Sequence, residues 1–248
     1  MVRFVMPIPL PQLNSEPDAP FPPVHGALSE PDGLLAFGGD LSSTRLLNAY
    51  RSGIFPWFSE GQAILWWCPH SRCVFNTHSL HLSSRFRRSL RQCPWHVVAD
   101  HDFGAVITAC AHTPRRGQDG TWITPAMVEA YLALHRQGWA HSIEVRDGDT
   151  LVGGLYGVVI GRMFFAESMY SARSGASKLA LAALAWRMAQ WQWPLIDAQI
   201  SNTHLLSLGA KTMARHEFIA EAARLTASPA AKSDFSTAFG MLPADTLA

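Results

Sequence analysis

The sequence predicts an α+β protein whose sheet is mixed and mostly antiparallel. Three segments separated by tight-turn signals have the apolar pattern of strands, and they read HSIEV, TLVGGLYGVV and RMFFAESMY. A nearly all-apolar helix is expected at 176–191, followed by a short returning strand at 194–200. Hairpins, a buried helix and a returning strand indicate helices layered on a mainly antiparallel sheet rather than a parallel βαβ series.

The composition is that of a globular protein. The chain has 248 residues, of which 48% are hydrophobic and 16% charged, enough apolar material for a sizeable core. A net charge of +1 gives no general attraction to a polyanion, so any nucleic-acid contact must be local. The absence of an 18-residue apolar run or a signal-like start predicts no membrane association.

The cysteines favour a reduced, cytoplasmic setting. They are few for the length of the chain and show no repeated pairing; they are Cys68, Cys73, Cys93 and Cys110. His70, His78 and His81 lie near the first two, but no second ligand pair follows at zinc-site spacing. We therefore expect no metal site.

A small N-terminal α/β module is expected at 1–70, followed by a larger domain at 71–248. Turn signals fill the first 35 residues. Ser42 then caps a short helix at 43–51 that Gly53 ends, and a strand follows at 63–67.

Five aromatic side chains crowd the end of this module. They are Phe55, Trp57, Phe58, Trp66 and Trp67. Such a cluster is either core packing or a platform on which a flat base can stack. The segment alone leaves both interpretations open.

Four arginines without an acidic partner lie on a helix expected at 83–92. Helical spacing forms two positive stripes from Arg85, Arg87, Arg88 and Arg91. A solvated helix face and a phosphate-binding patch both fit this pattern.

An amphipathic helix is expected to begin at Thr124 and Pro125 and to end at Gly138. Its apolar stripe is expected to contain Val128, Tyr131, Leu132 and His135.

Polar residues near the ends of two apolar strands are the candidate chemical groups. Glu167 follows a run of large apolar residues, and Asp197 and Gln199 are expected on one face of the strand at 194–200. Burying such groups unpaired is costly, so they either satisfy one another or hold a ligand. Asn202 and His204 just downstream favour a ligand site.

Several enzyme classes are excluded by missing motifs. The chain has no nucleophile elbow, no phosphate-binding Walker loop and no dinucleotide-binding glycine pattern. The remaining possibility is direct transfer of a group between two bound substrates. In such a reaction, positioning of the substrates provides most of the catalysis.

The sequence closely resembles the leucyl/phenylalanyl-tRNA–protein transferases over residues 20–220. The matching segments are EPDGLLAFGGDLSSTRLLNAYRSGIFPWF, ILWWCPHSR, GTWITPAMVEAYLALHRQGWAHSIEV, LVGGLYGV, FFAESMYS, ASKLAL, LIDAQ and HLLSLGA. The resemblance implies transfer of Leu or Phe from aminoacyl-tRNA to the α-amino group of proteins that begin with Arg or Lys. This modification marks the protein for degradation in the N-end rule pathway.

The resemblance also implies an N-acetyltransferase-like fold for the larger domain. Acyl-CoA enzymes of that fold carry a glycine-rich pyrophosphate loop, whereas this chain has SARSGASK at the same place. No cofactor is therefore expected, and the partners are Leu-tRNA or Phe-tRNA and the acceptor protein. We expect a monomer in the cytoplasm.

Several site residues are implied by the same resemblance. Trp57 and Trp122 correspond to the tryptophans against the terminal adenosine of the tRNA, while Trp66 and Trp67 are expected at the domain junction. The aminoacyl side-chain pocket corresponds to Phe164, Met169, Leu181 and Ile196, which also read as ordinary core residues. The arginine helix is the candidate contact for tRNA phosphates.

For the reaction, we expect Gln199 to accept a hydrogen bond from the acceptor amine and Asp197 to orient the Gln199 amide. Glu167 supplies negative charge for the cationic acceptor. The alternative is that Glu167 and Asp197 only complete a structural network. An acyl-CoA-dependent N-acyltransferase and a noncatalytic tRNA-binding module are the rival functions. CPHSR departs from the family's S-P-D-P-R, so Cys68 and His70 are assigned no role.

Overall fold

A computed structural model describes residues 10–113, 121–228 and 234–248 and confirms the α+β class. The chain is built around two sheets, one of four strands and one of eight. Residues 1–9, 114–120 and 229–233 lie outside the described ranges. Within those ranges, no helix is both long and apolar enough to cross a membrane.

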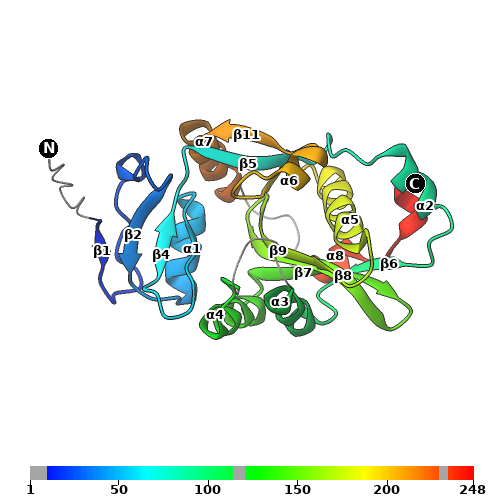
Figure 1. Cartoon of the computed structure of the whole chain (residues 1–248), viewed down its shortest axis with the longest axis horizontal. Helices are drawn as coiled ribbons and strands as arrows, with labels where there is room; N and C mark the ends of the chain where they lie inside the picture. Colours follow the sequence, from blue (N-terminus) through cyan, green and yellow to red (C-terminus); the bar gives the residue numbers. More distant parts are fainter. Residues whose placement is uncertain (1–9, 114–120, 229–233) are drawn as a thin grey trace, which may run out of the picture.

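The four-stranded sheet and helix α1 occupy one end of the molecule (Figure 1). Its elements are β1 (Gln12–Leu13), η1 (Val24–Gly26), β2 (Leu34–Gly38), α1 (Ser43–Arg51), β3 (Phe55–Pro56) and β4 (Leu65–Trp67). The strand order is β1-β2-β4-β3, with β1 parallel to β2 and the other pairs antiparallel. The expected cap of α1 is confirmed, because the Ser42 side chain accepts a hydrogen bond from the Arg45 backbone N–H.

The eight-stranded sheet has the order β11-β5-β10-β9-β8-β7-β6-β12. Its strands are β5 (Ser71–Asn76), β6 (His96–Ala99), β7 (Ala140–Asp147), β8 (Thr150–Ile160), β9 (Met163–Ser171), β10 (Leu195–Asp197), β11 (Lys211–Ala214) and β12 (Leu242–Pro243). Among the described strands of this sheet, only β9 and β10 pair in parallel, so the expected mixed, mostly antiparallel sheet is confirmed.

Helices cover both faces of the large sheet. They are α2 (Ser84–Leu90), α3 (Phe103–His112), α4 (Pro125–Arg136), α5 (Ala176–Gln190), α6 (Thr203–Ser207), α7 (Arg215–Thr226), α8 (Phe235–Phe239) and η2 (Ala244–Leu247). Figure 1 shows α5 on one side of β7 and β8, and α3 and α4 on the other. One core lies under α5; the other joins α3, α4 and the small sheet.

The local sequence signals were largely correct. The three hairpin strands and the helix at 176–191 are confirmed as β7, β8, β9 and α5. The α4 start is confirmed, since the Thr124 side chain accepts the Met127 backbone N–H. The expected apolar stripe of α4 faces the core, where Tyr131 is fully buried and Val128 and Leu132 are partly buried; Met127 and Leu134 are fully buried there as well.

The returning strand is shorter than expected. Strand β10 ends at Asp197, and Gln199 adopts a left-handed backbone with φ of 59°. The expectation that Asp197 and Gln199 share one face of a strand is therefore wrong. A left-handed residue breaks the alternation of side chains.

Strand β9 contains an irregularity at Glu167. Opposite it on β8, Tyr156 pairs with Ser168 while Gly157 pairs with Ala166, so Glu167 is the extra residue of a bulge. Bulges re-aim a side chain and are common beside active sites. Glu167 and Gln199 therefore both lie where a regular strand is interrupted. Glu167 is in the bulge of β9, and Gln199 lies beside it, just beyond the end of β10.

Candidate active site

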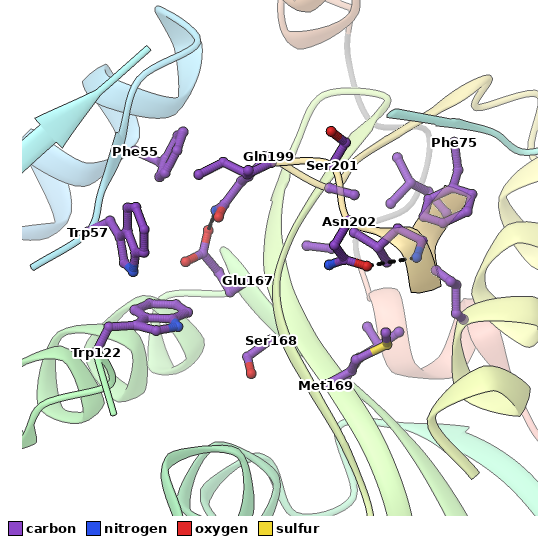
Figure 2. Close-up of a pocket in the computed structure, with 17 residues that line it drawn as sticks. Phe55, Trp57, Phe75, Trp122, Glu167, Ser168, Met169, Gln199, Ser201 and Asn202 are labelled. Atoms are coloured by element: carbon purple, nitrogen blue, oxygen red, sulfur yellow. Dashed lines mark hydrogen bonds between the residues drawn. The ribbon is translucent and has the colours of Figure 1, made fainter. Parts of the chain in front are cut away.

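A cavity of about 370 Å³ opens between the two sheets. It is lined by the end of β3, by β9, by α5 and by the segment from β10 to α6, and Figure 2 shows its labelled residues. Two indoles, Trp57 and Trp122, lie at one end; Met169 and Phe75 lie toward the other. Glu167 and Gln199 stand beside the indoles and are joined by a hydrogen bond.

Glu167 is the centre of a buried hydrogen-bond network. Its Oε1 accepts the Tyr50 hydroxyl at 2.7 Å and the Gln199 side-chain amide N–H at 2.7 Å. Its Oε2 accepts the Tyr131 hydroxyl at 2.9 Å. The two tyrosine hydroxyls also contact each other. Tyr50 comes from α1, Tyr131 from α4 and Glu167 from β9, so the network joins the small sheet to the large one.

Burial raises the pKa of Glu167 to about 7, although the Tyr50 and Tyr131 hydroxyls counteract this by stabilising the carboxylate. Burial and the nearby Glu167 charge raise the pKa of both tyrosines well above the ordinary value. The tyrosines are therefore donors at physiological pH, and Glu167 is the group of this network that titrates near neutrality.

We expect this carboxyl group to make folding less favourable as pH rises. The pKa of Glu167 is about 7 in the folded protein against an ordinary value of 4.5, so the folded state holds the proton more tightly. The resulting stabilisation is complete below pH 4.5 and is lost as pH rises through 7. A difference of about 2.5 units corresponds to about 3 kcal/mol in the free energy of unfolding.

Denaturant unfolding between pH 4.5 and 8 measures this effect in the wild type and in Glu167→Gln. The difference in unfolding free energy between the two proteins should change by about 3 kcal/mol across the range. A constant difference would show that Glu167 does not titrate there.

The Gln199 side chain has a different partner from the expected one. Its Nε2 donates to Glu167, and the residue lines the cavity. Asp197 instead accepts the Gln199 backbone N–H at 2.9 Å through Oδ1. Glu167 rather than Asp197 therefore orients the side-chain amide.

Asp197 is paired with a residue that the sequence did not single out. Both its oxygens accept hydrogen bonds from Arg72, from Nε at 2.8 Å and from Nη2 at 2.6 Å. Both side chains are buried. Tyr50 and Tyr131 were also missed as site residues. No local pattern marks these three, because their carboxylate partners lie between 36 and 125 residues away in sequence.

The structure brings the two predicted adenosine-binding tryptophans to one end of the cavity. Trp57 follows β3, and Trp122 precedes the cap of α4. Trp67 supports Trp57, since its indole N–H donates to the Trp57 carbonyl at 2.7 Å and the two ring centroids lie 5.5 Å apart. Both predicted rings are half-buried, leaving area for a ligand.

Trp66 and Trp67 build the small module itself. Trp66 is fully buried, donates its indole N–H to the Gly38 carbonyl and packs edge-on against Phe21. These contacts and those of Trp67 with Trp57 all lie within the first 70 residues. These hydrogen bonds and ring contacts of Trp66 and Trp67 therefore lie within the small module and not at the domain junction, where both residues were expected.

Three of the four predicted pocket residues line the cavity, namely Met169, Leu181 and Ile196. Phe164 does not line it, because its ring is fully buried in the core under α5. It pairs with Ile196 across β9 and β10, so its side chain lies beside that of Ile196 in the core under α5. Phe75 of β5 lines the cavity and was not predicted.

The four predicted phosphate-binding arginines lie outside the cavity. Arg85, Arg87 and Arg88 are exposed on α2, and Arg91 is its exposed C-cap. Arg87 also donates to the Leu247 carbonyl at 3.3 Å. Helix α2 packs through Phe86 against Gly175 at the start of α5, and the Lys178 ammonium lies 4.8 Å from the Phe86 ring centroid. The arginine helix is thus placed beside the helix that carries Leu181.

The four cysteines are free thiols. Burial raises the pKa of the Cys73 thiol to about 11, and it raises the pKa of Cys68 as well. Neither thiol is activated as a nucleophile. In the described part of the chain, no group of three His, Cys, Asp or Glu side chains is arranged to hold a metal ion.

Comparison with known proteins adds an independent observation. The family model described as "Leucyl/phenylalanyl-tRNA protein transferase" matches residues 74–223, and the model of its N-terminal domain matches residues 39–70. A curated leucyl/phenylalanyl-tRNA–protein transferase of Xanthomonas campestris pv. campestris (strain 8004) is 58% identical over 236 residues, which is 95% of each chain. One from Xylella fastidiosa (strain M12) is 60% identical over 223 residues, covering 90% of this chain and 91% of that one.

Proposed function

Because the chain belongs to the leucyl/phenylalanyl-tRNA–protein transferase family, we propose that its cavity joins Leu or Phe from aminoacyl-tRNA to the α-amino group of proteins that begin with Arg or Lys. The observation that carries this proposal is the Glu167–Gln199 pair. It lies between an aromatic end and an apolar end of one cavity. An aminoacyl-adenosine has the same order of parts: a flat base, a reactive ester and an apolar side chain.

Trp57 and Trp122 are proposed to hold the terminal adenosine of the tRNA. Stacking on an indole is tolerant of sequence and suits the end that all tRNAs share. The contacts of Trp67 with Trp57 support this role, because they preorganise one of the two rings. The arginines of α2 are proposed to contact phosphates farther along the tRNA.

The apolar end is proposed to select Leu and Phe. Its walls combine the flexible Met169 with Leu181, Ile196 and Phe75. A methionine side chain adapts to either a branched or a flat neighbour, whereas β-branched substrates are expected to fit less well. Phe164 is proposed to support this pocket rather than to contact the aminoacyl side chain.

The proposed reaction is attack of the neutral acceptor amine on the ester carbonyl. A C–N bond forms, the bond to the ribose oxygen breaks, and a proton from the amine goes to that oxygen. An α-amine with a pKa of about 7.7–8.0 is partly neutral at physiological pH, so no strong base is needed. The Gln199 amide oxygen accepts a hydrogen bond from the amine and aligns it on the carbonyl.

Glu167 is proposed to favour cationic acceptors while it orients Gln199. It is the only charged residue among the described residues that line this cavity. Its carboxylate attracts the ammonium or the Arg or Lys side chain of the acceptor. When ionised it can only accept hydrogen bonds, so it holds Gln199 with the amide N–H inward and the oxygen toward the amine.

The rival acyl-CoA function is disfavoured by the start of α5. The Phe86 ring lies against Gly175, and a Cβ placed there would come within 2.8 Å of it. A pyrophosphate that used this helix N-terminus would have to displace the ring. The intact Glu167–Gln199 network argues against a noncatalytic tRNA-binding module.

Residues 1–70 and 71–248 are proposed as the two domains, supported by the break between β4 and β5 and by the two family-model matches. The larger one is proposed to be N-acetyltransferase-like, which its single parallel pair beside a bulge supports. We further propose a cytoplasmic monomer that needs no cofactor and marks its acceptors for degradation in the N-end rule pathway.

Transfer of radiolabelled Leu from Leu-tRNA tests the function directly. We expect label on a peptide with N-terminal Arg and none on the same peptide with N-terminal Ala, because only the first offers a cationic side chain to Glu167. Label on both peptides would contradict acceptor selectivity. Label on neither, with folded protein and intact Leu-tRNA, would contradict the transferase; acetyl-CoA supplied to the same peptides then tests the rival donor.

A further inference from the structure

Arg72 makes an unusual set of contacts for a residue that does not line the cavity. It is 1% exposed, and its guanidinium group binds both oxygens of Asp197 side-on. Its third nitrogen, Nη1, donates to the Gly53 carbonyl at 3.1 Å. The Phe55 and Phe218 ring centroids lie 4.5 and 4.7 Å from its central carbon. The guanidinium group is therefore held in one position by both domains.

The Asp197 carboxylate, which Arg72 holds, also contacts a residue of the site. Asp197 Oδ1 also accepts the backbone N–H of Gln199, whose left-handed conformation is unfavourable for a residue with a side chain. Cys73, next to Arg72 on β5, donates its backbone N–H to the Gln199 carbonyl at 2.9 Å. Strand β5 thus holds Gln199 at two points, one of them through Asp197.

We propose that Arg72 is a positioning residue for aminoacyl transfer: by fixing the Asp197 carboxylate, it fixes the Gln199 backbone, so that the Gln199 amide meets both Glu167 and the acceptor amine. This inference rests on the proposed role of Gln199. Burial is the largest single influence and would lower the pKa of Arg72, but the Asp197 charge and its hydrogen bonds, with smaller contributions from Cys68 and Glu167, together raise it, so the guanidinium stays charged.

Arg72→Lys is the informative variant. Lysine keeps the charge but cannot bind two carboxylate oxygens side-on or fill the space between two rings. We expect kcat for Leu transfer to an Arg peptide to fall by about 10-fold or more, since small displacements of a positioned group are costly. The KM for Leu-tRNA should stay within about 2-fold, because Arg72 is not among the described residues that line the cavity, whereas Trp57 and Trp122 are.

A double-mutant cycle separates positioning from a general structural role. In a Gln199→Ala background, measured in single turnovers, Arg72→Lys should lower the rate by less than about 2-fold, because the group it positions is gone. An additive loss of about 10-fold in that background would overturn the proposal.

Arg45→Lys is the matched control. Arg45 is also fully buried and paired with a carboxylate, Asp40, but its other side-chain hydrogen bonds go to carbonyls of residues 14, 16 and 19. It should lower the unfolding midpoint and leave kcat within about 2-fold. An equal loss of kcat in both variants would overturn the proposal, because buried charge alone would then explain it.

A second variant covers the case in which Arg72→Lys does not fold. Arg72→Met combined with Asp197→Leu replaces the pair by apolar groups, a change that folded proteins commonly tolerate. We expect a folded protein with kcat lowered by about 10-fold or more. Wild-type kcat in this protein would overturn the proposal. Full activity of Gln199→Ala would instead contradict the proposed function of Gln199, before Arg72 is considered.

Discussion

Gln199→Ala should reduce the rate of Leu transfer to an Arg peptide by about 100-fold or more while leaving the Kd for Leu-tRNA unchanged. The variant removes the amide oxygen that aligns the amine, but it leaves the indoles and the apolar end in place. The loss should be in kcat, since the missing contact acts on the attacking amine. Single-turnover transfer and equilibrium binding of Leu-tRNA measure the two quantities separately.

Asn202→Ser is the control for this experiment. Asn202 also lines the cavity with an amide, and its side chain caps α6 by accepting the Leu205 backbone N–H. Serine retains that capping ability but removes the amide. The control should transfer Leu within about 3-fold of the wild-type rate. A Gln199→Ala rate as high as that of the control would mean that Gln199 belongs only to a structural network with Glu167.

Trp57→Ala and Trp122→Ala should each weaken binding of Leu-tRNA by about 1–3 kcal/mol, or roughly 5- to 150-fold in Kd. Each variant removes one of the two rings proposed to hold the terminal adenosine. Trp57→Phe should recover part of the loss, because phenylalanine keeps a smaller π-face. The measurement is Kd for intact Leu-tRNA beside Kd for tRNA that lacks its terminal adenosine, which the variants should bind as the wild type does.

Trp139→Ala provides the comparison for the two indole variants. Trp139 is a half-buried tryptophan that lines a different cavity, beside His135 and His141. It should bind both forms of the tRNA like the wild type. The Trp57 or Trp122 variants could instead lose affinity for the tRNA that lacks its terminal adenosine. That result would mean that these rings contact another part of the tRNA.

Elements with strong local signals could be predicted from the sequence, and elements defined by distant pairing could not. Helices α1 and α4 have capping side chains one turn from their N–H partners, and the β7–β9 hairpins are joined by short turns. Strand β5 reads SRCVFN, whose central four residues are all buried, so it shows neither alternation nor a turn partner. Its neighbours β10 and β11 come more than 100 residues later.

The site shows the same division. Glu167, Asp197 and Gln199 were found because polar residues in apolar strands stand out in the sequence. Their connections could not be predicted, since the bulge at Glu167 and the left-handed turn at Gln199 depend on register with β8 and on Asp197. Tyr50, Arg72 and Tyr131 look like ordinary core or surface residues until the fold brings them to the carboxylates.

The position of β5 also has a consequence for biosynthesis. A ribosome makes β5 before either of the strands that flank it, because β10 and β11 follow more than 100 residues later. Until both strands are made, β5 has two unpaired edges, and Arg72 lacks its partner Asp197, which lies 125 residues later in the sequence. Exposed edges of this kind favour association with other chains. A premature stop before Ala214 therefore leaves a polypeptide that lacks part of this sheet and is prone to aggregate.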